Sequence, residues 1–125
     1  YIPILFFFFF TAIWFFYMQH QHDPNYKAWK QDWQFLLAAI RGSSFYRLPA
    51  IFNFFTGNIG YHHIHHLAPK VPFYKLKKCS EENPIFQKHV TTISLLSSIK
   101  FAFYTLWDEE NYRMISFSQL QRIKV

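Results

Sequence analysis

The chain has 125 residues, a formal net charge of +6 and a very aromatic composition, with 23% Phe, Trp or Tyr and 17 Phe residues. This length suits one domain or part of one. Basic, aromatic chains can bind nucleic acid, but long uncharged runs argue against that class and favour a membrane protein with cytoplasmic Lys and Arg. The single cysteine, Cys79, excludes an internal disulfide and favours an intracellular or membrane setting.

The first 19 residues form an uncharged run, YIPILFFFFFTAIWFFYMQ, in which only Thr11 and Gln19 are polar. A helix of this length spans about 28 Å, close to the hydrocarbon thickness of a bilayer, and therefore predicts a transmembrane helix over residues 1–19. A cleaved signal peptide is one alternative, but the run carries neither the basic flank nor the small-residue cleavage site of such a peptide. A buried helix of a soluble protein is the other alternative, which the five consecutive Phe residues disfavour. The chain opens on Tyr1 inside this run, which suggests a segment of a longer protein.

The predicted helix stops where polar residues begin. Pro24 prevents easy continuation, so His20 is expected at the membrane–water boundary, on the end of the helix. Residues 35–40 are apolar but too short to span a bilayer, and residues 45–55 are aromatic with a stop at Pro49. Such short, interrupted pieces predict in-plane or re-entrant segments instead of a second span.

Four imidazoles crowd into residues 62–66, which read HHIHH. Read as H-x-x-H-H on a helix, His62, His65 and His66 share one face, whereas His63 points about 100° away. A neutral imidazole offers one lone pair, which iron, copper and zinc favour. The pattern therefore predicts a metal site, and the alternative is an exposed polar patch or an adventitious nickel or zinc binder.

The segments around this cluster differ in character. Gly57 and Gly60 precede it and indicate either a crowded site or an ordinary helical turn. Residues 79–84 (CSEENP) predict a turn that leads into a helix, and residues 85–107 carry apolar residues at roughly helical spacing, as in a surface helix. Between them lies a basic, extended connector with four lysines: Lys70, Lys75, Lys77 and Lys78.

Several stretches together carry a family resemblance. FTGNIGYHHIHHLAPKVPFYKL resembles the third histidine-box region of the integral-membrane fatty acid desaturases, closest to the bacterial and cyanobacterial-type acyl-lipid branch called delta-12 or omega-6. FFYMQHQHDPNYKAW resembles the end of the last transmembrane helix, IRGSSFYRLP the loop before the box, and KCSEENP and LWDEENYRMISF the C-terminal helix and tail. The resemblance covers essentially the whole chain, although hydroxylases and ketolases share the box alone.

The resemblance implies an all-α fold: an integral membrane helical bundle with a cytoplasmic, histidine-rich cap, of which this chain is the C-terminal part. Residues 1–19 would be a transmembrane helix, residues 20–67 a cytoplasmic or interfacial segment with the third box, and residues 68–125 a cytoplasmic C-terminal region. The parent protein would cross the membrane several times, with the histidine-rich region and the C-terminus in the cytoplasm.

The resemblance also implies a di-iron centre on histidines from three boxes and one extra position. The third box corresponds to His62, His65 and His66, and the extra ligand to His20; no catalytic residue is expected beyond the metal ligands. The first two boxes would lie upstream of Tyr1, so the fragment alone would be inactive.

Other groups near the ligands have expected supporting roles. Asp23, Asn58 and backbone carbonyls are candidates for orienting the imidazoles, and His63 is given a supporting role. His22 departs from the family pattern, in which an aromatic residue is common, and is expected to be solvated or supporting. His89 is expected at the surface.

The implied reaction introduces a C=C bond into a lipid-linked acyl chain with O2 as co-substrate and two external electrons. The electron donor would be a protein such as ferredoxin or cytochrome b5. The other partners would be the acyl lipid substrate and membrane lipid, and nucleic acid is not expected. Residues 45–55 and the aromatic face of the first span could line an acyl tunnel, although plain contact with lipid or core is the favoured interpretation. The lysines could dock an acidic donor or anionic head groups, or simply follow the positive-inside rule.

Three other functions compete with the desaturase hypothesis. A membrane di-iron hydroxylase or a carotenoid ketolase would share the box. A non-catalytic, metal-binding membrane fragment is a different class, and a membrane zinc protein is another, although the chain has neither H-E-x-x-H nor a set of Cys ligands.

Overall fold

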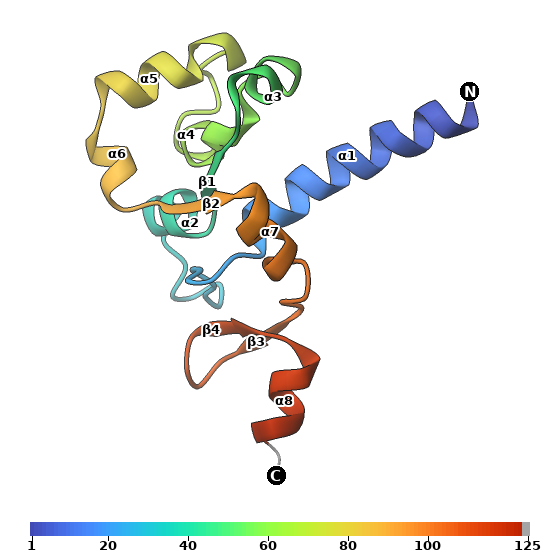
Figure 1. The fold of residues 1–125 in the computed structure, drawn as a ribbon. Coiled ribbons are helices and arrows are strands. Elements are labelled where there is room, and N and C mark those ends of the chain that lie inside the picture. The colour runs from blue at the N-terminus through green and yellow to red at the C-terminus, as the bar shows by residue number, and fades with distance from the viewer. Residues whose placement is uncertain (124–125) are drawn as a thin grey trace.

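The computed structural model describes residues 1–123, beginning with α1 (Ile2–His20), a 19-residue helix that stands away from the rest of the chain (Figure 1). Its apolar window has a mean hydropathy of 1.8, and only 11% of that window is buried. Among the described residues, α1 is the one helix long and apolar enough to cross a membrane. The helix predicted over residues 1–19 is thus confirmed, and its place in a bilayer remains a prediction.

The rest of the chain folds into short elements beside the C-terminal end of α1 (Figure 1). The remaining helices are α2 (Phe35–Arg41), α3 (Ala50–Phe55), α4 (His62–Leu67), α5 (Leu76–Glu82), α6 (Ile85–Lys88), α7 (Leu95–Phe101) and α8 (Phe117–Ile123), with 3-10 turns η1 (Ile59–Tyr61) and η2 (Phe73–Lys75).

Residues 1–123 also contain two small sheets of two strands each. Strand β1 (Ser44–Arg47) pairs in parallel with β2 (Thr91–Ser94), and β3 (Leu106–Asp108) pairs antiparallel with β4 (Arg113–Ile115). The chain is mainly helical, but the expectation of an all-α fold needs correction because these strands are present.

The expected helix over residues 85–107 is wrong, because the structure divides this stretch into α6, β2, α7 and β3. Val90, Thr91, Thr92 and Ile93 are β-branched and favour extended backbone. Pairing with β1 then satisfies the backbone groups of the extended segment. The helical spacing of apolar residues outside this run could not reveal the interruption.

The turn expected over residues 79–84 is instead helical as far as Glu82. Helix α5 starts at Leu76, so Ser80 lies inside it and is buried. The helix ends at Glu82, before Asn83 and Pro84, because the residue that precedes a proline avoids helical backbone.

Two apolar clusters set the positions of α1 and α4. Met18, near the end of α1, packs with Tyr46, Leu48 and Ile93 and so fixes α1 against the β1–β2 pair. The Tyr46 hydroxyl donates to Ser98 Oγ at 2.8 Å, which joins this cluster to α7.

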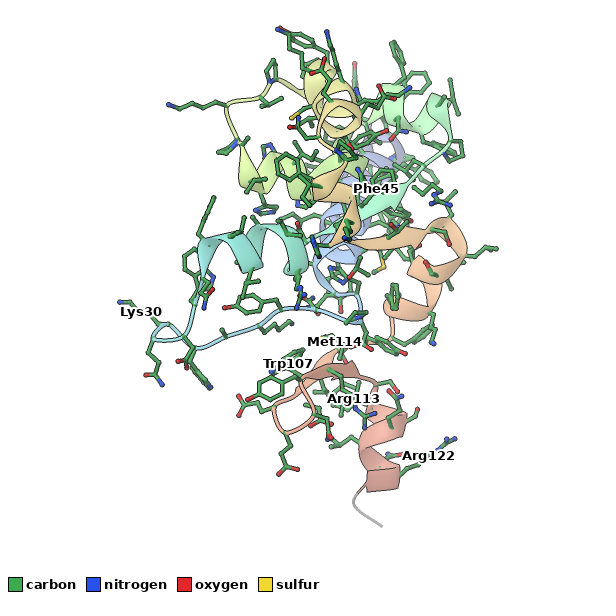
Figure 2. All side chains as sticks on the ribbon, turned by 90° about the vertical axis from the view of Figure 1, so that its left-hand side faces the viewer. Lys30, Phe45, Trp107, Arg113, Met114 and Arg122 are labelled. Carbon is green, nitrogen blue, oxygen red and sulfur yellow. The ribbon has the colours of Figure 1, made fainter. Side chains whose placement is uncertain are left out.

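The second cluster contains Tyr61, Ile64 and Leu76 and holds α4 against α5. Phe45 packs against it and lies in the middle of the molecule, whereas Lys30 lies at the outer edge of the loop before α2 (Figure 2).

Candidate metal centre

Three histidine rings from two distant parts of the chain converge on one point. His62 Nε2 lies 3.0 Å from His20 Nε2 and 3.0 Å from His66 Nε2, and the third side of the triangle, His66 to His20, is 3.3 Å. His20 is the last residue of helix α1, and the other two histidines lie one turn apart on α4. We call these three residues the histidine trio.

The local backbone explains how the trio forms. His62 and His66 are four residues apart on α4, so their rings lie on the same side of the helix. Asn25 Nδ2 donates to the His20 carbonyl at 2.6 Å, which satisfies a backbone acceptor at the end of α1. The last turn of α1 is thus held where it meets α4.

The ring of His20 is oriented by the backbone that follows α2. His20 Nδ1 lies 3.0 Å from the Gly42 carbonyl oxygen, and because a carbonyl can only accept, Nδ1 carries the hydrogen. In the neutral ring, Nε2 therefore presents its lone pair to the other two histidines. Metal-ligating imidazoles are typically held in this way by a partner on the second nitrogen.

Burial keeps the other two rings of the trio neutral. Burial, followed by the neighbouring His66 and His20, lowers the pKa of His62 to about 3. Burial and His20 also lower the pKa of His66 below its ordinary value. At neutral pH both rings are therefore uncharged, and each has one nitrogen with a free lone pair.

Hydrogen bonding alone does not satisfy three imidazole nitrogens in mutual contact. Each Nε2 atom either carries a hydrogen or presents a lone pair, so at least two of the three are of the same kind and repel each other. Two nitrogens that bond one ion at about 2.1 Å lie about 3.0 Å apart at a right angle and about 3.4 Å apart at the tetrahedral angle. The separations in the trio match this range, so the donor set fits one metal ion.

His65 lies next to the trio but does not join it. It is exposed, with its ring centroid 5.9 Å from that of His62 and 6.1 Å from that of His66. The structure thus brings together three of the four predicted ligands, and His65 lies beside them but outside their meeting point. That all four residues bind metal remains a prediction.

Two further histidines are buried without full hydrogen bonding. His63 is 0% exposed, packs edge-on against Phe45, and has neither ring nitrogen hydrogen-bonded within residues 1–123. Burial lowers its pKa to about 4, and the Ser44 backbone opposes the shift without reaching hydrogen-bond geometry.

His22 is also 0% exposed, and its Nδ1 donates to the Pro24 carbonyl at 2.8 Å. Burial lowers the pKa of His22 to about 4. Of the two roles expected for His22, the solvated one is therefore wrong and the supporting one stays a prediction, while the exposed position of His89 is confirmed.

The two polar side chains expected to orient the imidazoles have other partners. Asp23 Oδ1 accepts a hydrogen bond from the Met114 N–H at 3.0 Å, which connects the segment after α1 to β4. Asn58 Nδ2 donates to the Phe73 carbonyl at 3.2 Å, and Asn58 has left-handed backbone with φ 57°. Of the orienting groups that the sequence suggested, the structure uses a backbone carbonyl, that of Gly42, and no sequence pattern singled out this position.

Gly60 lets the turn before α4 approach β1 closely. A Cβ atom at this position would lie 2.5 Å from the Tyr46 carbonyl oxygen and 3.1 Å from Asn53 Oδ1. Gly57 has a positive φ of 61°, as glycine in a turn commonly does. Both of the interpretations offered by the sequence thus apply, one to each glycine.

An apolar groove of about 510 Å³ between α1 and α3 reaches the histidine trio at His62. Its lining includes rings from α1 and α3, namely Phe8, Phe15, Phe16, Phe52 and Phe55. The polar side chains in the lining are Thr11, Gln19, Thr56 and His62. The sequence raised this arrangement as the less favoured alternative to plain lipid contact.

A larger hollow of about 620 Å³ lies away from the histidines, between the loop before α2 and the β3–β4 hairpin, where Trp107 is found (Figure 2). Lys27 Nζ sits 5.8 Å from the centroid of the Trp107 ring in this region. No residue of the trio lines this hollow.

The lysines after the box lie on the surface. Lys77 and Lys78 form exposed ion pairs with Glu81 and Glu82, at 3.8 Å and 3.6 Å. Such pairs contribute little to stability.

Comparison with known proteins assigns the chain to a class. Residues 1–96 match the family described as fatty acid desaturase, and the chain belongs to the fatty acid desaturase family. A protein of Bacillus subtilis (strain 168) named fatty acid desaturase is 44% identical over 114 residues, which cover 91% of this chain and 32% of that relative. The chain thus spans about a third of the length of this curated relative. No solved structure matches the chain.

Proposed function

We propose that this chain is the C-terminal part of an O2-dependent, di-iron fatty acyl desaturase that introduces a C=C bond into a lipid-linked acyl chain. The observation that carries the proposal is the meeting of three imidazole nitrogens at one end of an apolar groove, in a chain of the desaturase family. Two iron ions, when bound, would supply the O2 chemistry that removes two hydrogens from an unactivated CH2–CH2 unit, with two electrons from an external donor.

In this proposal His20, His62 and His66 hold one iron ion. Neutral nitrogen ligands suit iron and resist oxidation. His65 lies beside the trio but outside it, so it would serve the second ion together with histidines from boxes elsewhere in the longer protein. The Gly42 carbonyl would keep the His20 ring in its ligating tautomer.

The groove between α1 and α3 would hold the acyl chain. Its aromatic walls match the apolar methylenes of a fatty acyl substrate, and its volume lies in the range of ligand pockets. Because the groove ends at His62, a chain lying in it would pass beside the trio, and its bulk would exclude water there.

The remaining assignments follow from the family and the charge pattern. The parent protein would cross the membrane several times, with α1 as one span, residues 20–67 as an interfacial segment and residues 68–125 in the cytoplasm. The exposed lysines of residues 70–78 would face the cytoplasm and could receive an acidic electron donor such as ferredoxin or cytochrome b5.

The test is the fatty acid profile of a host that expresses the full-length protein, beside hosts that express its His62→Ala and His89→Ala variants. We expect a new double bond with the wild type and with His89→Ala, which removes an exposed ring, and none with His62→Ala. An unchanged profile from a wild-type protein that contains iron and lies in the membrane would refute the desaturase proposal. Such a result would favour a hydroxylase or a carotenoid ketolase, which share the histidine box.

A further inference from the structure

One polar side chain in the α1–α3 groove has its hydrogen-bonding capacity unused. Thr11 donates to the Phe7 carbonyl and Thr56 to the Phe52 carbonyl, each at 2.7 Å, so both hydroxyls are satisfied by the turn that precedes them. His62 Nε2 belongs to the histidine trio, although His62 Nδ1 is buried without a partner within residues 1–123. Gln19 is different, because neither Oε1 nor Nε2 of its carboxamide has a hydrogen-bond partner within the same residues.

Gln19 is also completely buried, with 0% of its surface exposed, next to the ligand candidate His20. Leaving a buried polar group without a partner is costly, so such groups in native proteins normally have a role or a partner that binds. Gln19 belongs to the lining of the groove, so a ligand that enters the groove would supply the missing partner.

We infer that Gln19 binds the ester carbonyl of the acyl substrate and thereby sets the direction and depth at which the chain lies in the groove. This inference rests on the proposed function. The carbonyl is the one strongly polar group near the methylene chain of an acyl ester, and it accepts hydrogen bonds. A carboxamide offers two N–H donors that complement it.

Polarity along the groove gives the acyl chain one orientation. Gln19 and His62 are at one end, whereas Phe8 lies 11 residues before Gln19 on α1, about 16 Å along the helix axis. The carbonyl would therefore lie at the Gln19 end of the groove and the methyl end toward Phe8, with the methylenes that follow the carbonyl nearest the trio. The new double bond would then form at a constant number of carbons from the carbonyl, whatever the length of the chain.

The first experiment measures binding to the full-length metal-loaded protein without an electron donor, so that no turnover occurs. The probes are a fatty acyl ester lipid and an ether lipid of equal length in which CH2 replaces the carbonyl. We expect the wild type to bind the ester about tenfold more tightly than the ether, the size expected for one hydrogen bond in a buried site. Equal binding of the two lipids by the wild type would overturn the inference without any variant.

Gln19→Met keeps the length of the side chain but removes both N–H donors. Gln21→Met is the matched control, because it is the same substitution two residues later and Gln21 does not line the groove. Gln19→Met should bind ester and ether equally, whereas Gln21→Met should keep the wild-type ratio. If Gln19→Met does not accumulate in the membrane, Gln19→Leu serves in its place. A variant that loses metal but keeps the wild-type ratio of ester to ether binding would show that Gln19 has only a structural role.

The second experiment maps the new double bond in products made from acyl chains of different length. We expect the wild type to keep a constant count from the carbonyl and Gln19→Met to yield a mixture of positions. A constant count from the methyl end would overturn the inference. A wild type that prefers the ester in binding but makes no double bond would refute the proposed function and leave the role of Gln19 intact.

Discussion

Gly42 carries the backbone carbonyl that orients His20, so its replacement by alanine tests whether this contact supports metal binding. The backbone of Gly42, with φ −84° and ψ −5°, is accessible to alanine. The added Cβ atom, however, would lie 2.5 Å from the Ala38 carbonyl oxygen, closer than non-bonded atoms approach. The segment after α2 must therefore shift, and the Gly42 carbonyl shifts with it.

Two magnitudes follow from this clash. Overpacking of this kind costs about 1–3 kcal/mol of stability. Lengthening the 3.0 Å contact to His20 Nδ1 removes the group that holds the ring, and loss of such a partner typically weakens metal binding about 10–100-fold. We expect Gly42→Ala to remain folded and to bind one metal equivalent at least tenfold more weakly than the wild type.

The assay is a cobalt titration of the full-length, metal-free protein in detergent, followed by its absorption spectrum. Arg41→Ala is the control, because Arg41 is an exposed side chain on the same end of α2. Arg41→Ala should leave both cobalt equivalents unchanged. Wild-type cobalt affinity in a folded Gly42→Ala protein would refute the idea that the Gly42 carbonyl supports the ligand.

Three further predictions concern the histidines and the packing around them. His65→Ala should remove one of two metal equivalents and His66→Ala the other, as measured by iron analysis of each purified protein; loss of the same equivalent from both would contradict the division of ligands. Gly60→Ala should lower the free energy of unfolding by about 1–3 kcal/mol in denaturant titrations, because its Cβ atom would lie 2.5 Å from the Tyr46 carbonyl oxygen, and no change would disprove the close approach. Tyr46→Phe should cost about 1 kcal/mol in the same titration through loss of the 2.8 Å bond to Ser98, and a stability equal to wild type would show that this bond contributes nothing.

Local patterns explain which elements could be predicted. The uncharged run of residues 1–19 predicts a long helix because composition and length alone specify it, and α1 matches it. The spacing of His62 and His66 places their rings on one face of α4 for a similarly local reason. The sequence did not predict the β1–β2 pair, because each strand has only four residues and the two strands lie far apart in the chain.

For single residues, the sequence shows the chemical type of the side chain but not its burial or its partner. Whether His22 and His63 would be solvated or buried depends on β1 and the loops packed over them, which no spacing within the sequence reports. Asp23 and Asn58 have the right chemistry to orient imidazoles, yet Met114 and Phe73 are their partners. Chemical type is visible in a sequence, whereas the partner of a polar group depends on residues far away in the chain.

The sequence by itself determined the long apolar helix, the histidine box and the family, because each depends on residue types at fixed local spacing. Only the tertiary structure decided that His20 meets His62 and His66 while His65 stays outside this group, and that the Gly42 carbonyl orients the His20 ring. It also decided that the lining of the groove from Phe8 to His62 includes Gln19, whose buried carboxamide has no hydrogen-bond partner within residues 1–123. These features join residues more than 20 positions apart, and packing of α1 against β1, not local propensity, brings such residues together.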